Sequence, residues 1–302
     1  MNRKTIVVGL LALAVIVVGL VYVKGHRDAA STRPSSTPTS TLTKEEKDRI
    51  QKFWILYRKA KALKLAGDWE AAIPEYRRAL ELDPRHEDSL YSLANSHFEL
   101  NQFEEALGVL KLLVEVNGMS HRGYHQMAII RACPLAGASF DLEAAQAALD
   151  RAFELNQEET GALLSLGELA LVKGDEKRAF ELLALANQSN FRAVQGYYLR
   201  AYMRWKERRP DESRDLLLEA IRQSKKPKVV AGVPGEGDTR PGSLQPPTTA
   251  DEKRLIKPVW SGLAHRYPDD RIGPEALAAE FAPLGAYLEQ LRTRVADDAA
   301  SK

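Results

Sequence analysis

The chain has 302 residues, and its 43 Lys and Arg against 41 Asp and Glu give a formal net charge of +2 at pH 7. This near balance excludes a general polyanion binder, because attraction to nucleic acid or anionic lipid needs a clear excess of positive charge. The single cysteine excludes an intrachain disulfide framework and any zinc or iron–sulfur site held by several cysteines of the chain. Stability must therefore come from packing.

An uncharged apolar run follows a short tail at residues 1–4 and extends over residues 5–23, TIVVGLLALAVIVVGLVYV. As a helix it would span roughly 28 Å, close to the hydrocarbon thickness of a bilayer. We expect a transmembrane helix here. A cleaved signal peptide is the alternative, although its apolar core is usually only about 7–15 residues long. Lys24, His26 and Arg27 stand where its cleavage site would be, while Ala29 and Ala30 leave cleavage open.

Residues 24–43 form the next segment, which is rich in Ser, Thr and Pro and predicts an extended stalk rather than a packed core. Positive charges flank the apolar run on both sides, so charge alone does not decide the topology. The stalk and the short amino-terminal tail favour a single-pass anchor that exports the rest of the chain. We therefore expect a membrane protein whose main domain is extracytoplasmic.

A repeat begins after the stalk: AAIPEYRRALELDP at 71–84 is echoed by EALGVLKLLVEVNG at 105–118, one period of 34 residues later. In the same register, small residues recur at Ala60, Ala72 and Ala79 with larger apolar residues between them. The units lie near 53–86, 87–120, 121–159, 160–193 and 194–227, and the third fits only with an insertion within 133–140. This pattern resembles the tetratricopeptide repeat (TPR) family.

The resemblance implies an all-α fold, an α-solenoid of about five TPR-like helix–turn–helix repeats over residues 44–224. Two helices meet closely only where a small side chain lets a larger neighbour enter, which is why the small positions recur. A capping box at Thr43–Glu46 places the start of the first helix near Lys44.

TPR arrays bind peptides or protein segments on a concave surface lined by the first helix of each repeat. Carried over position by position, the resemblance places a peptide-binding groove at Trp54, Tyr57, Lys61, Lys64, Tyr91, Asn95, Phe98, Arg122, His125, Tyr198, Tyr202 and Trp205. Such a surface, aromatic with a few cations, predicts a segment with apolar side chains and some negative charge. The alternative is that several of these aromatic residues belong to the core or are covered by the carboxy-terminal helices. A two-carboxylate clamp is not expected, because Tyr57 and Lys61 stand where that clamp has Lys and Asn.

Residues 225–250 are rich in Pro and Gly and predict a loop. A second capping box at Thr249–Glu252 predicts a helix that carries Leu255, Ile256, Val259, Trp260 and Leu263 on one face. A last helix is expected from Gly273-Pro274, with a stripe of Leu277, Phe281, Leu284, Leu288 and Leu291, before a tail at 297–302. We expect residues 251–296 to cap the array; a partner protein is the other candidate to cover the stripe.

No motif for chemistry accompanies these elements. His121 and His125 lack an evident third metal ligand, and Cys133 has no neighbour that would activate it. We therefore expect no metal, cofactor, nucleic acid or small-molecule substrate, and a protein that is not an enzyme. The predicted function is a membrane-anchored scaffold or adaptor that binds a protein or peptide partner, in the assembly of an envelope complex. The alternative is an enzyme or enzyme subunit whose site residues 232–270 form against the array.

Overall fold

The computed structural model describes residues 42–226 and 252–300, with side chains up to residue 297. Contacts divide the chain into two compact units, Met1–Asp48 and Arg49–Lys302, and the packing below concerns the second. All regular elements in the described ranges are helices, and no strand occurs in them. The all-α architecture expected from the sequence is confirmed for this part of the chain.

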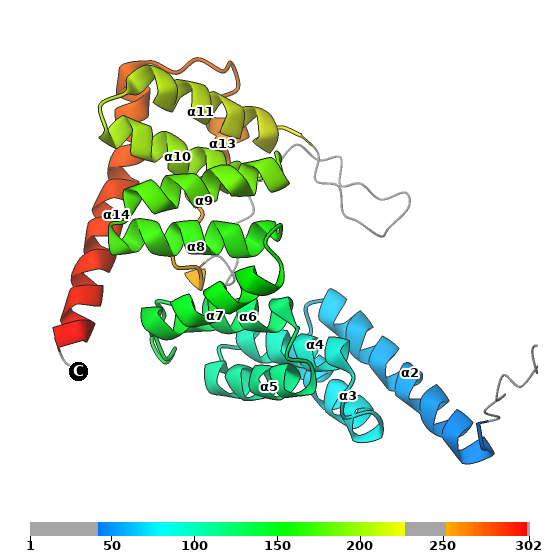
Figure 1. Cartoon of the computed structure of the whole chain (residues 1–302). Helices are drawn as coiled ribbons and strands as arrows, with labels where there is room; N and C mark the ends of the chain where they lie inside the picture. Colours follow the sequence, from blue (N-terminus) through cyan, green and yellow to red (C-terminus); the bar gives the residue numbers. More distant parts are fainter. Residues whose placement is uncertain (1–41, 227–251, 301–302) are drawn as a thin grey trace, which may run out of the picture. The chain divides into compact units, whose positions relative to one another are not determined.

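Ten helices form five consecutive helix–turn–helix pairs, which Figure 1 shows stacked side by side. The pairs are α2 (Lys44–Leu65) with α3 (Trp69–Leu82), α4 (Glu87–Glu99) with α5 (Phe103–Val116), α6 (His121–Arg131) with α7 (Leu142–Leu155), α8 (Thr160–Lys173) with α9 (Glu176–Ser189), and α10 (Val194–Lys206) with α11 (Pro210–Ser224).

Small residues allow the helices of a pair to approach closely. Ala60, Ala72 and Ala79 are fully buried between α2 and α3. At Gly167 of α8, an added Cβ would lie 2.7 Å from Leu183 Cγ of α9, so a larger residue would displace the Leu183 side chain. In the last pair Ser213 stands at a small position, and its hydroxyl donates to the carbonyl of Ala201 at 2.9 Å.

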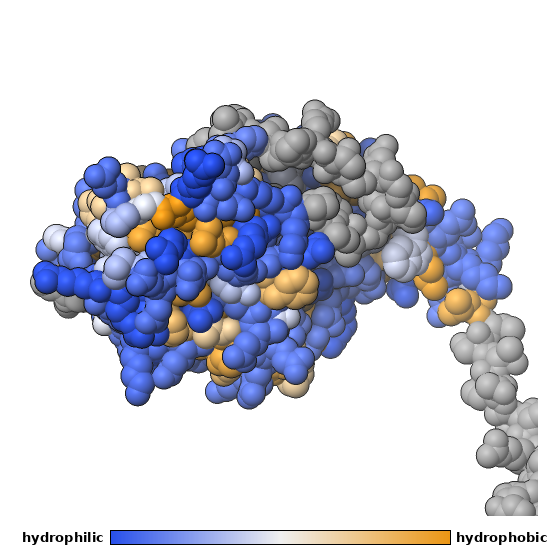
Figure 2. Space-filling view, turned by 90° about the horizontal axis from the view of Figure 1, so that it is seen from above, coloured by the Kyte–Doolittle hydropathy of each residue, from blue (hydrophilic) through white to orange (hydrophobic). Residues whose placement is uncertain are grey.

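The apolar residues form connected cores inside the stack. One core joins α4, α5 and α6, and the largest extends from α6 through α11 to the carboxy-terminal helices. Figure 2 shows a face of the molecule on which hydrophilic side chains dominate and apolar ones gather only in small, separate places. Between α6 and α7 the chain makes the loop 132–141, which contains the inserted residues, and burial there raises the pKa of the Cys133 thiol.

The carboxy-terminal region differs from the expected pair of helices. Residues 253–262 are turns and irregular backbone, followed by the short α13 (Leu263–Arg266) and the long α14 (Pro274–Ala300). The helix predicted from the capping box does not extend through Ile256, because this stretch follows the surface of the array and buries Lys253, Leu255 and Ile256 there. Pro258 also lacks the N–H that a helix would need.

Helix α14 packs against α8, α10 and α11 (Figure 1). The expected stripe faces that contact: Leu277, Phe281, Leu284, Leu288 and Leu291 are all buried. The predicted transmembrane segment 5–23, most of the stalk 24–43 and the loop 227–250 lie outside the described residues. None of the described helices is long and apolar enough to cross a membrane.

Candidate functional site: the surface of the first helices

The predicted groove residues all lie on α2, α4, α6 and α10, four of the five helices that come first in their pairs, the fifth being α8. Neighbouring first helices adjoin, since α4 contacts α6 and α6 contacts α8. The structure divides these residues into two groups. Those toward α10 are covered by residues 252–297, which we call the C-terminal clasp, and those toward α2 are open.

Three predicted aromatic residues on α10 pack against the clasp. Tyr198 is fully buried, and its hydroxyl donates to the carboxylate of Glu280 at 2.9 Å. The centre of the Phe281 ring lies 5.3 Å from that of Tyr198, 6.0 Å from that of Tyr202 and 5.9 Å from that of Trp205. In this structure the chain's own residues therefore occupy the surface on which a bound segment was expected.

Phe98 of α4 is also covered, by a lysine of the clasp. The ammonium group of Lys253 lies 4.8 Å from the centre of the Phe98 ring and donates to the carbonyls of Phe98 and Glu99 at 2.7 and 2.8 Å. Lys253 is only 1% exposed. These carbonyls end α4 and carry the negative end of its macrodipole, so they solvate the buried cation.

Arginines of α14 make similar contacts further along the array. Arg292 donates to the carbonyls of Leu171 and Val172 near the end of α8, at 2.8 and 3.3 Å. Arg294 donates to the carbonyl of Pro134 in the loop between α6 and α7 at 2.6 Å. The clasp is thus held by cations on backbone carbonyls as well as by apolar packing.

The open part begins with an aromatic cluster on α2. Trp54 is 44% exposed. The ring centres of Trp54 and Tyr57 lie 5.6 Å apart, and that of His86 lies 5.0 Å from that of Tyr57. Lys61 is exposed one turn further along the same helix. This part of the surface presents rings beside a cation.

A charged group continues the open part on α4 and α6. The Arg122 guanidinium lies 4.8 Å above the ring of Tyr91 and donates to Asp88 at 2.7 Å. That hydrogen bond lowers the pKa of the Asp88 carboxyl. Lys64 donates to Ser92 at 3.3 Å, and burial lowers the pKa of its ammonium group. Asn95 is half-buried on the same helix as Tyr91.

The sequence-based site omitted Asp88 and His86. Asp88 holds the same repeat position as Trp54 and Arg122, the second of its unit, so the register itself was a signal for it. His86 precedes α4 and accepts a hydrogen bond from the backbone N–H of Ser89, which makes it the cap of that helix. Nothing in the repeat pattern marked its contact with Tyr57.

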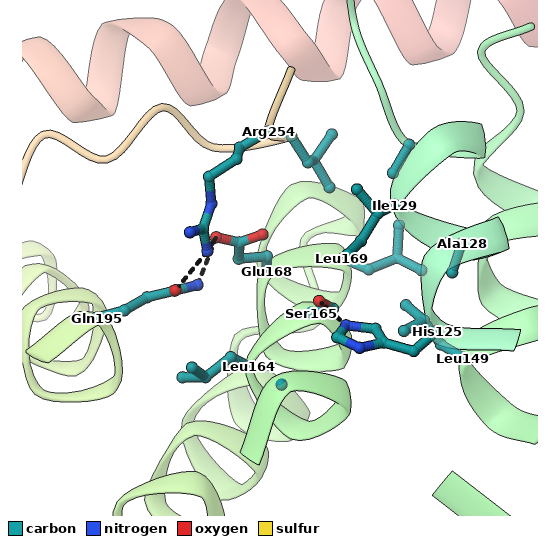
Figure 3. A pocket seen from close by; sticks show the side chains of 13 residues that line it. His125, Ala128, Ile129, Leu149, Leu164, Ser165, Glu168, Leu169, Gln195 and Arg254 are labelled. Atoms are coloured by element: carbon teal, nitrogen blue, oxygen red, sulfur yellow. Dashed lines mark hydrogen bonds and ion pairs between the residues drawn. The ribbon is translucent and has the colours of Figure 1, made fainter. Parts of the chain in front are cut away.

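His125, the remaining predicted residue, lies in a cavity between the array and the clasp. The cavity has a volume of about 410 Å³ and is lined by His125, Ala128, Ile129, Ala132, Leu149, Gly161, Leu164, Ser165, Glu168, Leu169, Gln195, Arg254 and Leu255. Figure 3 shows Arg254, Glu168 and Gln195 converging on one side, while His125 meets Ser165 on the other. Leu164, Leu169 and Ile129 contribute apolar surface to its lining.

Burial governs the electrostatics of this cavity. Glu168 is only 5% exposed, and desolvation raises the pKa of its carboxyl to about 7, against the opposing effect of the Arg254 charge. Arg254 lies 3.8 Å from the Glu168 carboxylate and donates to the Gln195 side chain at 2.7 Å. Glu168 was a visible signal in the sequence, being an acid within the apolar helix TGALLSLGELALVK. Arg254 was not, because its segment was predicted as a helix.

The His125 imidazole lies between Ser165 and Glu159, at 3.0 Å from the Ser165 hydroxyl and 3.7 Å from the Glu159 carboxylate. Burial lowers the pKa of the imidazole. Gly161 makes room for the ring, because an added Cβ would lie 2.7 Å from it. Ser165 sits in mid-helix, where backbone N–H groups are engaged within the helix and do not form an oxyanion hole. The arrangement therefore suits binding better than acyl transfer.

His121 also lies near Glu159, with its Nδ1 4.0 Å from the carboxylate. In the described part of the chain, no three His, Cys, Asp or Glu side chains are grouped to hold a metal ion.

Comparison with family models gives two matches, both described as tetratricopeptide repeat, over residues 63–127 and 135–190. Comparison with curated proteins gives no significant match. Among solved structures, the chain resembles that in a study of Pseudomonas aeruginosa pilF, with 20% identity, a TM-score of 0.50, and 59% of this chain and 85% of that chain covered.

Two further structures are similar over part of the chain. YrrB, described as a TPR protein with an unusual peptide-binding site, has 19% identity, a TM-score of 0.43 and coverage of 56% and 84%. The first TPR of Spaghetti (RPAP3), bound to an HSP90 peptide, has 23% identity, a TM-score of 0.38 and coverage of 41% and 94%. At these identities the likeness concerns the fold alone. The chain thus contains tetratricopeptide repeats at 63–127 and 135–190, within an all-α solenoid of TPR-like helix pairs.

Proposed function

We propose that the protein is a scaffold or adaptor that captures a protein segment on the open part of its first-helix surface, in the assembly of an envelope complex. The observation that carries this proposal is an open row in which Trp54 and Arg122 are exposed and Tyr57 and Tyr91 are half-buried. Aromatic and arginine side chains are preferred anchors of protein interfaces because they bury large areas at low cost in rotamer freedom.

The charges on this surface favour a segment that is partly acidic. Lys61 and Lys64 lie near Asp88 and Arg122, so three cations surround one carboxylate. The Asp88–Arg122 pair is exposed, at 56% and 45% of the two side chains, and an exposed pair contributes only about 0–1 kcal/mol. A carboxylate of an incoming segment can therefore replace Asp88 on Arg122 at little cost.

Site-specific photo-crosslinking in native membranes tests the capture. A benzophenone amino acid placed at Tyr91 of the full chain is expected to yield discrete products, and one placed at the exposed Lys111 of α5 is the control. With the crosslinker at Tyr57, Arg122→Glu should lower the yield roughly tenfold, because a charge-assisted hydrogen bond becomes a repulsion. Identical products from Tyr91 and Lys111, or a yield that Arg122→Glu leaves unchanged, would contradict the proposal.

We further propose that residues 5–23 anchor the chain as a single transmembrane helix, with the repeats on the extracytoplasmic side. Support comes from the uncharged apolar run and the Ser, Thr and Pro-rich residues after it. A reporter fused after Lys302 is expected to be accessible to protease outside intact cells, and the chain to stay in the membrane fraction after carbonate washing. A reporter protected within the cytoplasm would overturn the topology, and release by carbonate would overturn the anchor.

A further inference from the structure

The cavity between α6, α8, α10 and the clasp has the dimensions of a small-molecule site. Its volume of about 410 Å³ lies within the roughly 300–1,000 Å³ typical of ligand pockets, and far above the roughly 150 Å³ that accommodates benzene. The walls are mainly aliphatic, from Ile129, Leu149, Leu164, Leu169 and Leu255. A ligand that fills it must therefore be mainly apolar.

Above about pH 7, where Glu168 is ionised, charge in the cavity is already balanced. The lining holds one carboxylate, Glu168, and one guanidinium, Arg254, which lie 3.8 Å apart. A charged ligand would lose its hydration and find no unpaired counter-charge, which is costly in a site with apolar walls. The occupant that fits is uncharged.

A hydrogen-bonding pair lines the cavity away from these charges. Figure 3 shows the Ser165 hydroxyl and the His125 ring meeting there, 3.0 Å apart. The serine hydroxyl has one proton and two lone pairs, so its bond with His125 leaves capacity for a second partner. One polar group on the ligand can form this second hydrogen bond, and the rest of the ligand packs against the aliphatic walls.

We propose that this cavity binds an uncharged, mainly apolar molecule that carries a single hydroxyl group, held at Ser165 and His125. This site is separate from the open surface proposed for protein capture, so the failure of one proposal leaves the other standing. A free alcohol or phenol has the required chemistry, and so has a tyrosine side chain of another protein.

Binding is tested at pH 8, where Glu168 is ionised, with three probes of one shape, namely naphthalene, 2-naphthol and 2-naphthoate, on the full chain in lipid nanodiscs. Methyl NMR signals of Ile129 and Leu164 report occupancy of the cavity, and the exposed Leu185 reports nonspecific partitioning. We expect 2-naphthol to bind roughly fivefold more tightly than naphthalene, the contribution of one hydrogen bond. Binding of 2-naphthoate should be weakest.

Two variants localise the effect. Ser165→Ala should reduce the affinity for 2-naphthol to that for naphthalene, and Ser165→Phe should fill the cavity and abolish both shifts. Ser261→Phe, the same change at an exposed serine, is the control and should leave binding unchanged. Tighter binding of 2-naphthoate than of 2-naphthol, or shifts that persist in Ser165→Phe, would overturn the proposal. If N-acetyltyrosine amide displaces 2-naphthol, a protein side chain is supported as the source of the hydroxyl. If it does not, a free molecule is supported.

Discussion

At the scale of single residues, polar side chains decide how the covered surface is built. Glu168 is buried on α8 with Gln195 and Arg254 as neighbours, and Lys253 is buried on the end of α4. Burying an ionised group costs free energy unless partners compensate, and the two residues meet this cost differently. Lys253 has two carbonyls and the nearby Glu99 carboxylate. Glu168 avoids this cost by staying protonated, and so uncharged, up to a higher pH.

The raised pKa of Glu168 makes stability depend on pH in a defined direction. The folded carboxyl has a pKa of about 7 against the usual 4.5, so the folded state binds the proton more tightly. Its contribution to the free energy of unfolding is fully present below about pH 4.5 and is lost as the pH rises through about 7.

Glu168→Gln should remove this dependence while keeping a side-chain oxygen that can accept from Gln195. We compare the variant with the parent by the difference in their free energies of unfolding. This difference should favour the variant by about 1–3 kcal/mol more at pH 8 than at pH 4.5. Urea unfolding at both pH values measures this, with Glu181→Gln at an exposed position of α9 as the control. A difference that is equal at the two pH values would show that the carboxyl titrates normally.

At the scale of elements, the clasp combines an irregular stretch with a helix. Helix α14 buries a continuous apolar stripe on α8, α10 and α11, as a terminal cap of a repeat array is expected to do. Residues 252–262 instead attach through Lys253, Leu255 and Ile256. Because few residues hold this stretch, a single substitution should loosen it without unfolding α14.

Lys253→Met is the direct test of that attachment. Removing the ammonium group takes its donor from the carbonyl of Glu99 and leaves that of Phe98 with the Asn101 N–H, which should lower the free energy of unfolding by about 2–3 kcal/mol. Cleavage by trypsin after Arg254, followed by mass spectrometry, should become at least tenfold faster. Lys257→Met, at an exposed position of the same stretch, should change neither quantity. Equal cleavage rates in both variants would show that Lys253 does not hold the clasp.

At the scale of the described part of the molecule, the clasp changes the character of the array. In a simple solenoid each repeat contacts only its neighbours, so stability adds along the chain. Here hydrogen bonds from the clasp join residues more than 100 positions apart, from Lys253 to α4, Arg292 to α8 and Arg294 to the loop after α6. These three contacts are made to α4 and to later elements, not to α2 or α3, where the surface proposed for capture begins. The clasp thus couples the later repeats and leaves the first pair to local packing.

The amino-acid sequence by itself determined the helix pairs. The recurrence of small residues such as Ala72 and Ala106 every 34 residues, and the capping box before Lys44, act within one repeat, so they can be recognised without tertiary structure. It also determined that Leu277, Phe281 and Leu284 form an apolar stripe, because residues spaced by about 3.6 positions lie on one face of a helix. Such a stripe must be covered.

Only the tertiary structure decided which groove residues remain open. Trp54 and Tyr198 carry similar repeat-based predictions, yet Trp54 is 44% exposed and Tyr198 is fully buried, because residues more than 50 positions later fold back on α10. The path of Lys253–Ile256 could not be predicted from the sequence either. Its local pattern favours a helix, whereas Lys253 contacts the distant carbonyls of Phe98 and Glu99. Local periodicity specifies elements, whereas the choice among apolar surfaces that could be covered depends on contacts at long sequence separation.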